Sequence, residues 1–382
     1  MRNVLCETLG VQFPLFAFSH CRDVVAEVTR AGGMGVLGIV SMSPEQLEAE
    51  LSWIDERVDG KPYGVDLIVP SKFIGKSEGD GRAPDPARVL ADLPEAHRAF
   101  AAELLKASGL DPDIPDADRI ARMRSGANMT AEGAHAMMDV AFSHPIKLIA
   151  NALGVPPKEM LDRGKAEGVP VAALVGTKEH AIRQASAGVD VIVAAGGEAG
   201  GHCGSISTMV LVPEVVEAMK DFGDRPVLAA GGIVTGRQMA AAMAMGAAGA
   251  WCGSVWLTTA EAETNAAVKA KMLTASSSDT VRSRARTGKH SRQLRSPWTD
   301  AWEREGAPDP LGMPLQSLIS EPALARINKM ADAGHEGAQA LATYWVGQGV
   351  GLMNEAMTCR QVVEGFMEDF AGAHETLAAC FD

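Results

Sequence analysis

Short apolar runs alternate with helical patterns along most of the chain. Eight runs are predicted to be strands: Phe13–Ser19, Gly35–Val40, Tyr63–Val69, Ile146–Ala150, Val169–Leu174, Val189–Ala194, Pro226–Ala230 and Gly249–Gly253. Near-continuous apolar runs are typical of parallel strands, because such strands are buried on both faces. The alternation of strands and helices therefore predicts a parallel α/β fold.

Helical spacing separates most of these runs. In Pro44–Val58 the residues Leu47 and Leu51 fall on one face, and Ser43 with Gln46 is placed to form a capping box. The other helices predicted between strands are Arg22–Arg30, Lys158–Glu167, Lys178–Ala187, Pro213–Lys220 and Gly236–Met245. Eight strand units favour a closed TIM (β/α)8 barrel over an open doubly wound sheet.

Two segments do not fit eight simple units. Residues 70–144 are too long for one strand-to-helix connection and open with the polar, glycine-rich stretch Ser71–Pro86. The helices predicted in the two segments are Val89–Lys106, Asp118–Arg124, Thr130–Val140, Glu321–Met330 and Val362–Ala379. We predict a barrel of residues 1–275, interrupted by a helical insertion at 70–144 after strand 3. Residues 276–382 are expected to form a C-terminal helical extension that packs on the barrel.

The insertion follows a strand, so we expect it on the catalytic face, as a cover or an oligomer contact. A homodimer is compatible with this interpretation. No uncharged apolar run is long enough to span a membrane, so no membrane partner is expected.

Charge and cysteine usage narrow the possible partners. The 382 residues include 35 Lys and Arg against 48 Asp and Glu, a net charge of −13, so general nucleic-acid binding is not expected. The six cysteines include no C-x-x-C pair, so their spacing argues against a zinc site and against a small disulfide framework. We therefore expect no bound metal. With no signal peptide at the N-terminus, we predict a cytoplasmic protein with reduced thiols.

Three glycine-rich turns each follow a predicted strand: Gly196–Gly204, Gly231–Gly232 and Gly253–Ser254. Glycine allows close backbone approach and positive φ, and the N–H groups of such turns bind phosphate. In barrels the loops after strands seven and eight commonly form a phosphate site, and the second and third turns fall there. The alternative is that these glycines only close tight turns. No phosphate-loop motif with lysine is present, so we expect a permanently bound phosphorylated cofactor, with FMN as the candidate.

Two polar residues stand out at strand ends. His202, between glycines after the sixth strand, is predicted to be a general base at the barrel mouth, although an exposed loop histidine is the alternative. Cys203 as a nucleophile with His202 as its base is disfavoured, because adjacent side chains rarely point at each other. Asp66 interrupts an apolar strand and either binds a ligand ring or pairs with a Lys or Arg. The basic residues after Ser276 are predicted to be a solvated face or a partner for acidic surface.

Several motifs together resemble the nitronate monooxygenase family. They are Ala31–Gly38, Gly188–Asp190, Glu198–His202, Thr208, Leu211–Pro213, Ala229–Ile233, Gly246–Ala247 and Thr287–Lys289. The resemblance implies a TIM barrel that binds FMN. It also implies that His202 removes the α-proton of a nitroalkane or orients the nitronate. With O₂ as co-substrate the products would be a carbonyl compound and nitrite.

The resemblance also implies which residues hold the cofactor. Those expected around the phosphate and ribityl chain are Gly200, Gly201, Gly231, Gly232, Gly253 and Ser254. Those expected near the flavin ring are Ala17, Phe18, Ser19 and Asp66. Asp66 lies where the family usually has an asparagine, and Ala17–Ser19 replaces the usual A-P-M.

A second flavin family shares the E-A-G-G-H and T-x-x-L-V-P motifs. These are the FMN-dependent enoyl-acyl-carrier-protein reductases, in which NAD(P)H reduces the flavin and an enoyl thioester is the substrate. Both the monooxygenase hypothesis and the reductase hypothesis imply a small-molecule substrate. A degenerate barrel that serves as a non-catalytic scaffold is the third hypothesis.

Overall fold

The computed structural model describes residues 3–39, 42–68, 86–125 and 131–381. The predicted ends of two strands, Val40 and Val69, and nearly all of the polar stretch 71–86 lie outside these residues. Within the described residues, no helix has both the length and the apolar character needed to cross a membrane.

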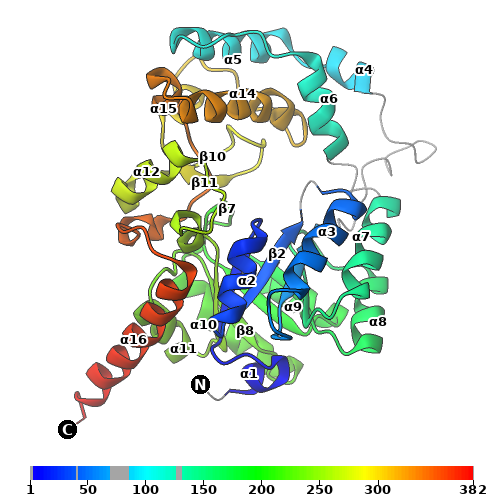
Figure 1. Cartoon of the computed structure of the whole chain (residues 1–382), viewed down its shortest axis with the longest axis vertical. Coiled ribbons are helices and arrows are strands. Elements are labelled where there is room, and N and C mark those ends of the chain that lie inside the picture. Colours follow the sequence, from blue (N-terminus) through cyan, green and yellow to red (C-terminus); the bar gives the residue numbers. More distant parts are fainter. Residues whose placement is uncertain (1–2, 40–41, 69–85, 126–130, 382) are drawn as a thin grey trace.

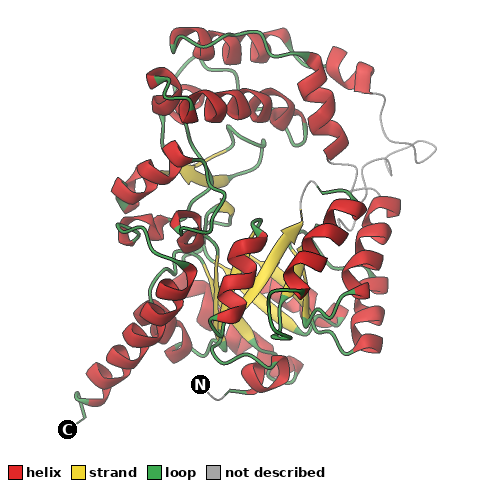
Figure 2. Ribbon diagram, viewed as in Figure 1, coloured by secondary structure: helices red, strands yellow, loops and turns green. Residues whose placement is uncertain are grey.

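Eight parallel strands close into a barrel, in the order β1-β2-β3-β4-β5-β6-β8-β9. The strands are β1 (Leu15–Ser19), β2 (Met34–Ile39), β3 (Gly64–Leu67), β4 (Leu148–Asn151), β5 (Val171–Val175), β6 (Val191–Ala195), β8 (Val227–Ala230) and β9 (Gly249–Cys252). Pairing of β9 with β1, which includes Phe16 opposite Trp251, completes the ring. Figure 2 shows the strands at the centre of the lower body. The TIM barrel and all eight predicted strands are confirmed.

The inside of the barrel is filled by alternate residues of each strand. They include Phe16, Met34, Val36, Leu148, Val191, Leu228 and Trp251. The ring of Phe16 stacks on that of Trp251 with centroids 6.1 Å apart. The intervening residues, such as Ala17 and Val65, face outward toward the helices. Because both faces are covered, most of the strands are apolar runs, and Asp66 in β3 is an exception.

Helices form the outer layer of the barrel. They are α2 (Arg22–Arg30), α3 (Pro44–Asp55), α7 (Ala131–Ser143), α8 (Lys158–Glu167), α9 (Lys178–Ala187), α10 (Thr208–Met219), α11 (Gly236–Ala244) and α16 (Cys359–Ala378), with α1 (Val4–Leu9) below. The capping box of Ser43 and Gln46 is present. The prediction that α10 starts at Pro213 is wrong by five residues. Its first turn is fixed by the Glu198 carboxylate, which accepts hydrogen bonds from the N–H and hydroxyl of Thr208.

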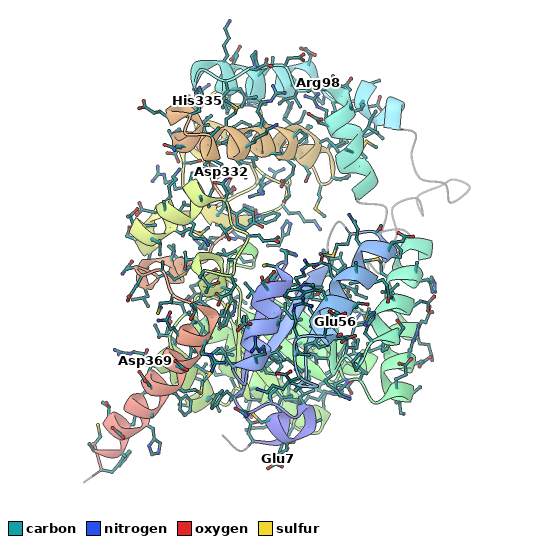
Figure 3. The ribbon with its side chains drawn as sticks, in the orientation of Figure 1. Glu7, Glu56, Arg98, Asp332, His335 and Asp369 are labelled. Carbon is teal, nitrogen blue, oxygen red and sulfur yellow. The ribbon has the colours of Figure 1, made fainter. Side chains whose placement is uncertain are left out.

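A second helical layer lies at one end of the molecule (Figure 1). It combines α4 (Pro86–Ala91), α5 (Glu95–Ala107) and α6 (Asp116–Ser125) with α12 (Ala266–Thr274), α13 (Pro297–Glu303), α14 (Leu315–Asp332) and α15 (Glu336–Leu341). Figure 3 places Arg98, Asp332 and His335 in this layer. The Asp332 carboxylate accepts a hydrogen bond from the Ala266 N–H and so links α14 to α12. Segments about 200 residues apart in sequence thus pack as one layer.

Both segments that depart from the simple repeat also supply helices to the barrel. Helix α7 packs against α3, and α16 packs against α11 and α2. An ion pair between Arg237 and Asp369, 3.2 Å long, joins α11 to α16. Figure 3 shows Asp369 on α16. A barrel needs a helix between β3 and β4 and another after β9, and α7 and α16 occupy those places. The division at residues 70, 144 and 275 stays a prediction about domains.

Candidate active site

Four loops meet at the carboxyl end of the barrel. Three follow β6, β8 and β9, and the fourth leads into the short helix η5 (Gln348–Leu352). The Ser254 hydroxyl accepts a hydrogen bond from the Gly347 N–H at 2.8 Å, and the Gln348 N–H donates to the Glu198 carbonyl at 2.9 Å. A Cβ added to Gly200 would lie 2.8 Å from the Gly347 nitrogen. Glycine is therefore required for this backbone approach.

The loop after β8 is held in a left-handed conformation. Gly231 and Gly232 have φ of +108° and +70°, which side chains rarely adopt. The Thr208 hydroxyl lies 3.0 Å from the Gly231 carbonyl, and the Gln238 amide donates to the Gly232 carbonyl at 2.8 Å. The loop is thus anchored to the starts of α10 and α11. We refer to Gly200, Gly231, Gly232, Ser254 and Gly347 as the glycine cradle.

The structure brings most of the predicted phosphate-site residues together. Gly200, Gly231, Gly232 and Ser254 lie in the glycine cradle, Gly201 follows Gly200 at the start of a short strand, and Gly253 precedes Ser254. Gly347 and Gly349 were not singled out from the sequence. The signal was available, because Trp345–Gly351 reads W-V-G-Q-G-V-G and has the same glycine density as the other loops.

The three residues predicted at the first strand face different ways. Ala17 is fully buried among residues of the outer core, so its side chain cannot reach the barrel mouth. Phe18 packs inside, 6.4 Å from the ring of Trp251, and Gly253 would place a Cβ 3.7 Å from it. The Ser19 hydroxyl accepts a local hydrogen bond from the Cys21 N–H at 3.1 Å.

His202 lies on β7 (Gly201–His202), a strand outside the barrel. It pairs with Ser291 of β11 (Ser291–Leu294), which in turn pairs with β10 (Thr280–Ser283). The His202 side chain stays accessible to solvent. Desolvation by the surrounding protein lowers its pKa, as do the nearby charges of Lys289 and Arg286. A hydrogen bond to the His290 backbone opposes this shift in part.

An arginine supports the aromatic neighbour of His202. The His202 and Trp345 rings have centroids 6.5 Å apart, and the Arg286 guanidinium lies 4.0 Å from the centre of the Trp345 ring. Arg286 also forms a two-pronged ion pair with Glu321, at 2.8 and 3.2 Å, and its side chain is only 5 % exposed. This buried pair fixes one face of Trp345. The sequence indicated neither Trp345 nor Glu321.

Other residues of the basic run hold the loop that carries His202. Arg292 donates two hydrogen bonds to the Gly197 carbonyl, at 3.0 and 2.8 Å. Arg282 donates to the Cys203 carbonyl at 3.4 Å. Of the two alternatives predicted for the basic run, pairing with an acidic group holds for Arg286, whereas Arg282 and Arg292 are half-buried and donate to loop carbonyls. Their charge is used inside the protein because the folded loops bring unpaired carbonyls and a carboxylate to them.

Asp66 points into the barrel near the carboxyl end of β3. It lies in register with Gly38 and Ala150, which face the same way. The residue is 2 % exposed, and within the described part of the chain neither carboxyl oxygen makes a hydrogen bond of ordinary geometry, although the Ala152 backbone N–H lies close enough to lower the pKa. The ion pair considered from the sequence is therefore not formed there. Burial raises the pKa of Asp66 to about 7, and the nearby Ala152 backbone opposes the rise.

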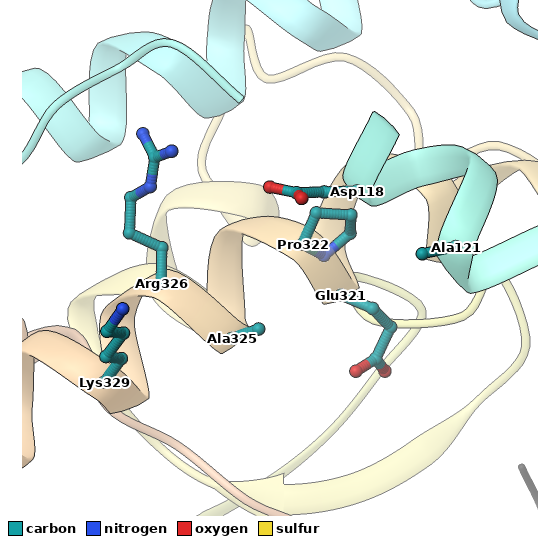
Figure 4. A pocket seen from close by; sticks show the side chains of 7 residues that line it. All are labelled: Asp118, Ala121, Glu321, Pro322, Ala325, Arg326 and Lys329. Carbon is teal, nitrogen blue, oxygen red and sulfur yellow. The ribbon is translucent and has the colours of Figure 1, made fainter. Parts of the chain in front are cut away.

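An open groove of about 560 Å³ lies in the second helical layer, away from the glycine cradle (Figure 4). Its lining comes from α6 and α14: Asp118, Ala121, Glu321, Pro322, Ala325, Arg326 and Lys329. Arg326 is engaged there by the backbone carbonyls of Asp111 and Asp113, at 2.9 and 2.5 Å. None of the residues predicted from the sequence to bind the cofactor is among those that line this groove.

Comparison with known proteins shows which family the chain belongs to. A family model described as nitronate monooxygenase matches residues 3–369. A Mycobacterium tuberculosis protein that is named, provisionally, as a monooxygenase is 54 % identical over 371 residues, covering 97 % of this chain and 96 % of the relative.

Two solved structures show the same fold. Nitroalkane oxidase from Streptomyces ansochromogenes superposes with a TM-score of 0.78 and 24 % identity, over 98 % of this chain and all of the other. The enoyl reductase domain of MlnA from Bacillus amyloliquefaciens has a TM-score of 0.66 and 14 % identity, over 99 % of this chain and 98 % of the other. With the family match across nearly its whole length, the chain belongs to the nitronate monooxygenase family, a family of flavin-dependent oxidoreductases.

Proposed function

We propose that the protein is an FMN-dependent enzyme that oxidises nitronates or nitroalkanes with O₂ to a carbonyl compound and nitrite. The observation that carries the proposal is the position of His202. Its strand continues directly from Gly200 of the glycine cradle, and Arg292 and Arg282 brace the loop on both sides of it. This position supports the proposal that His202 acts as a base beside a phosphate site at the mouth of the barrel.

The residues present fit a phosphorylated flavin. The glycine cradle offers backbone without side chains at the carboxyl ends of the barrel strands, which a phosphate can approach closely. Gly231, Gly232, Gly253 and Ser254 would hold the phosphate end, while Phe18 and Asp66 would lie toward the ring. Bound flavin would supply the electron transfer to O₂, which no amino-acid side chain here can supply.

His202 is suited to accept a proton from carbon. Its lowered pKa leaves the imidazole neutral near pH 7, which is the form a general base requires. The backbone carbonyl of His290 can only accept, so a hydrogen bond to it uses one ring N–H and leaves the other ring nitrogen free as a base. The positive charges of Arg286 and Lys289 would favour the anionic nitronate that forms.

The test begins with the visible spectrum of the purified protein, which should be yellow. Nitrite release is then followed under air with a neutral nitroalkane and with its preformed nitronate. The proposal requires nitrite from the nitronate with no added NAD(P)H. A yellow protein that releases no nitrite from a range of nitronates would contradict it.

Reduction of an enoyl thioester by NAD(P)H is the second candidate. It is supported by the E-A-G-G-H motif shared with that reductase family and by the fold likeness to an enoyl reductase domain. Bleaching of the flavin by NADH without air, followed by reoxidation with an enoyl thioester, would favour it. A colourless protein that takes up no FMN would favour the scaffold hypothesis. The cytoplasmic location and a homodimer stay predictions.

A further inference from the structure

We infer that Asp66 contacts the flavin ring as a neutral carboxylic acid, and that its ionisation weakens FMN binding. This inference rests on the proposed function, because it assumes FMN at the barrel mouth. It goes further in assigning a protonation state to one residue of this chain and a pH dependence to cofactor retention.

The position of Asp66 carries the inference. Its side chain lies inside the barrel, at the register of Gly38 on β2 and Ala150 on β4. Both carboxyl oxygens are buried, and in the described structure neither makes a hydrogen bond of ordinary geometry; only the Ala152 backbone N–H is close enough to oppose the rise in pKa. An unpartnered polar group in an apolar interior is costly, so it is retained where a ligand completes its hydrogen bonds.

Aromatic rings crowd the barrel end beside Asp66. Gly38 has no side chain, and a Cβ there would lie 2.7 Å from the Phe18 ring and 2.8 Å from that of His20. The two rings are packed edge to face, with centroids 5.1 Å apart. Phe18 also stacks on Trp251, with an interplanar angle of 25°. Asp66 is the buried acid beside this aromatic group.

No described charge faces Asp66 from the strands packed against it. The residues of β2, Met34–Ile39, and of β4, Leu148–Asn151, include no Asp, Glu, Lys, Arg or His. His20, just after β1, is the titratable group next to Gly38. Its Nδ1–H donates to the Gly38 carbonyl at 2.7 Å, and desolvation lowers its pKa, so the ring is neutral above pH 7.

The chemistry of the ring edge favours the neutral acid. A flavin ring presents carbonyl acceptors together with one N–H donor. A neutral carboxyl can both donate and accept, as an amide does, whereas a carboxylate only accepts. A carboxylate here would also oppose the negative charge of a reduced flavin at short range in a low-dielectric site.

FMN affinity depends on pH because FMN binding and protonation of Asp66 are thermodynamically linked. Burial already raises the pKa of Asp66 to about 7 without a ligand. A ring covering the carboxyl removes more water and raises this pKa further, so the complex holds the proton more tightly than the free protein. FMN affinity is then constant below pH 7 and falls as pH rises, approaching tenfold per pH unit.

The test measures how much FMN the holoenzyme releases on dilution, by recovery of free flavin fluorescence, at pH 6.5 to 9. Wild type should show a dissociation constant that rises more than tenfold between pH 7 and 9. Asp66→Asn, an amide of the same shape, should bind FMN with little change over this interval. Asp162→Asn removes the same charge from an exposed position on α8 and should follow wild type.

The outcomes separate the two proposals. A flat wild-type profile, or the same decline in Asp66→Asn, overturns the role of Asp66 while FMN binding stands. Failure of wild type to bind FMN at pH 6.5 overturns the proposed function and this inference with it. If Asp66→Asn does not fold, two measurements on wild type replace it. FMN affinity must fall between pH 7 and 9, and the holoenzyme at pH 7 must show the infrared carbonyl band of a protonated carboxylic acid. Absence of either one overturns the role of Asp66.

Discussion

The Ser254 hydroxyl accepts a hydrogen bond from the Gly347 amide at 2.8 Å, across 93 residues of sequence. This contact ties the loop after the last barrel strand to a loop that returns from the second helical layer. The proposed phosphate site is therefore completed by a segment outside the (β/α) repeat.

Gly200→Ala is expected to reduce FMN retention by more than tenfold. The new Cβ would lie 2.8 Å from the Gly347 nitrogen and 2.8 Å from the Val346 carbonyl carbon, so the loops must separate. Overpacking of this kind costs about 1–3 kcal/mol. Dilution of the holoenzyme measures retention. Gly312→Ala, in a loop position with nothing within 4 Å of the added carbon, serves as the control and should retain FMN as wild type does.

His202→Asn is expected to lower kcat/KM for a neutral nitroalkane by about 10²- to 10⁴-fold, the usual range for loss of a general base. Turnover of the preformed nitronate should change much less, because its proton is already gone. His374→Asn, at an exposed position on α16, is the matched control. Equal losses on both substrates would mean that His202 does not act as the base.

The pH profile gives an independent check on His202. Its folded pKa lies below the ordinary value, about 6.5, so the neutral base predominates above that pH. We expect kcat/KM for the neutral nitroalkane to rise with pH along an acid limb with a midpoint below 6.5 and then to level off. When the preformed nitronate is the substrate, kcat/KM should not show this rise with pH. A midpoint above 7 would contradict the assignment.

Arg286→Met is expected to destabilise the fold by about 3–5 kcal/mol, because it removes the cation that forms the two-pronged ion pair with the buried Glu321 carboxylate. The side chains are 5 % and 15 % exposed, so solvent screens the pair little. Urea denaturation measures the loss. The double variant Arg286→Met with Glu321→Leu should recover much of it, whereas additive losses would show that the pair itself is not what stabilises this region.

Gly236→Ala is expected to lower the free energy of unfolding by about 1–3 kcal/mol through overpacking. Its added carbon would collide with the Phe366 carbonyl, where α11 packs against α16. Gly372→Ala in α16 meets nothing within 4 Å and should raise stability by up to about 1 kcal/mol. Thermal unfolding compares the two. Equal effects would indicate that the contact between the two helices is not tight.

Local patterns were enough to predict the strands and several helices. The residue bounds of α2, α8 and α9 agree with those predicted from spacing and flanking residues. The early start of α10 could not be read locally, because it depends on the Glu198 carboxylate from a distant loop. The same is true of Arg292, whose partner, the Gly197 carbonyl, is 95 residues away.

The sequence by itself determined the barrel, the glycine loops and the histidine between glycines. These features are local: burial on both faces demands apolar strands, and tight turns demand glycine. Only the tertiary structure decided that Gly347 completes the glycine cradle, that Arg286 holds Trp345 beside His202, and that Asp66 makes no hydrogen bond of ordinary geometry within the described residues. Each of these depends on which distant segments meet, and residue spacing along the chain carries no record of those contacts.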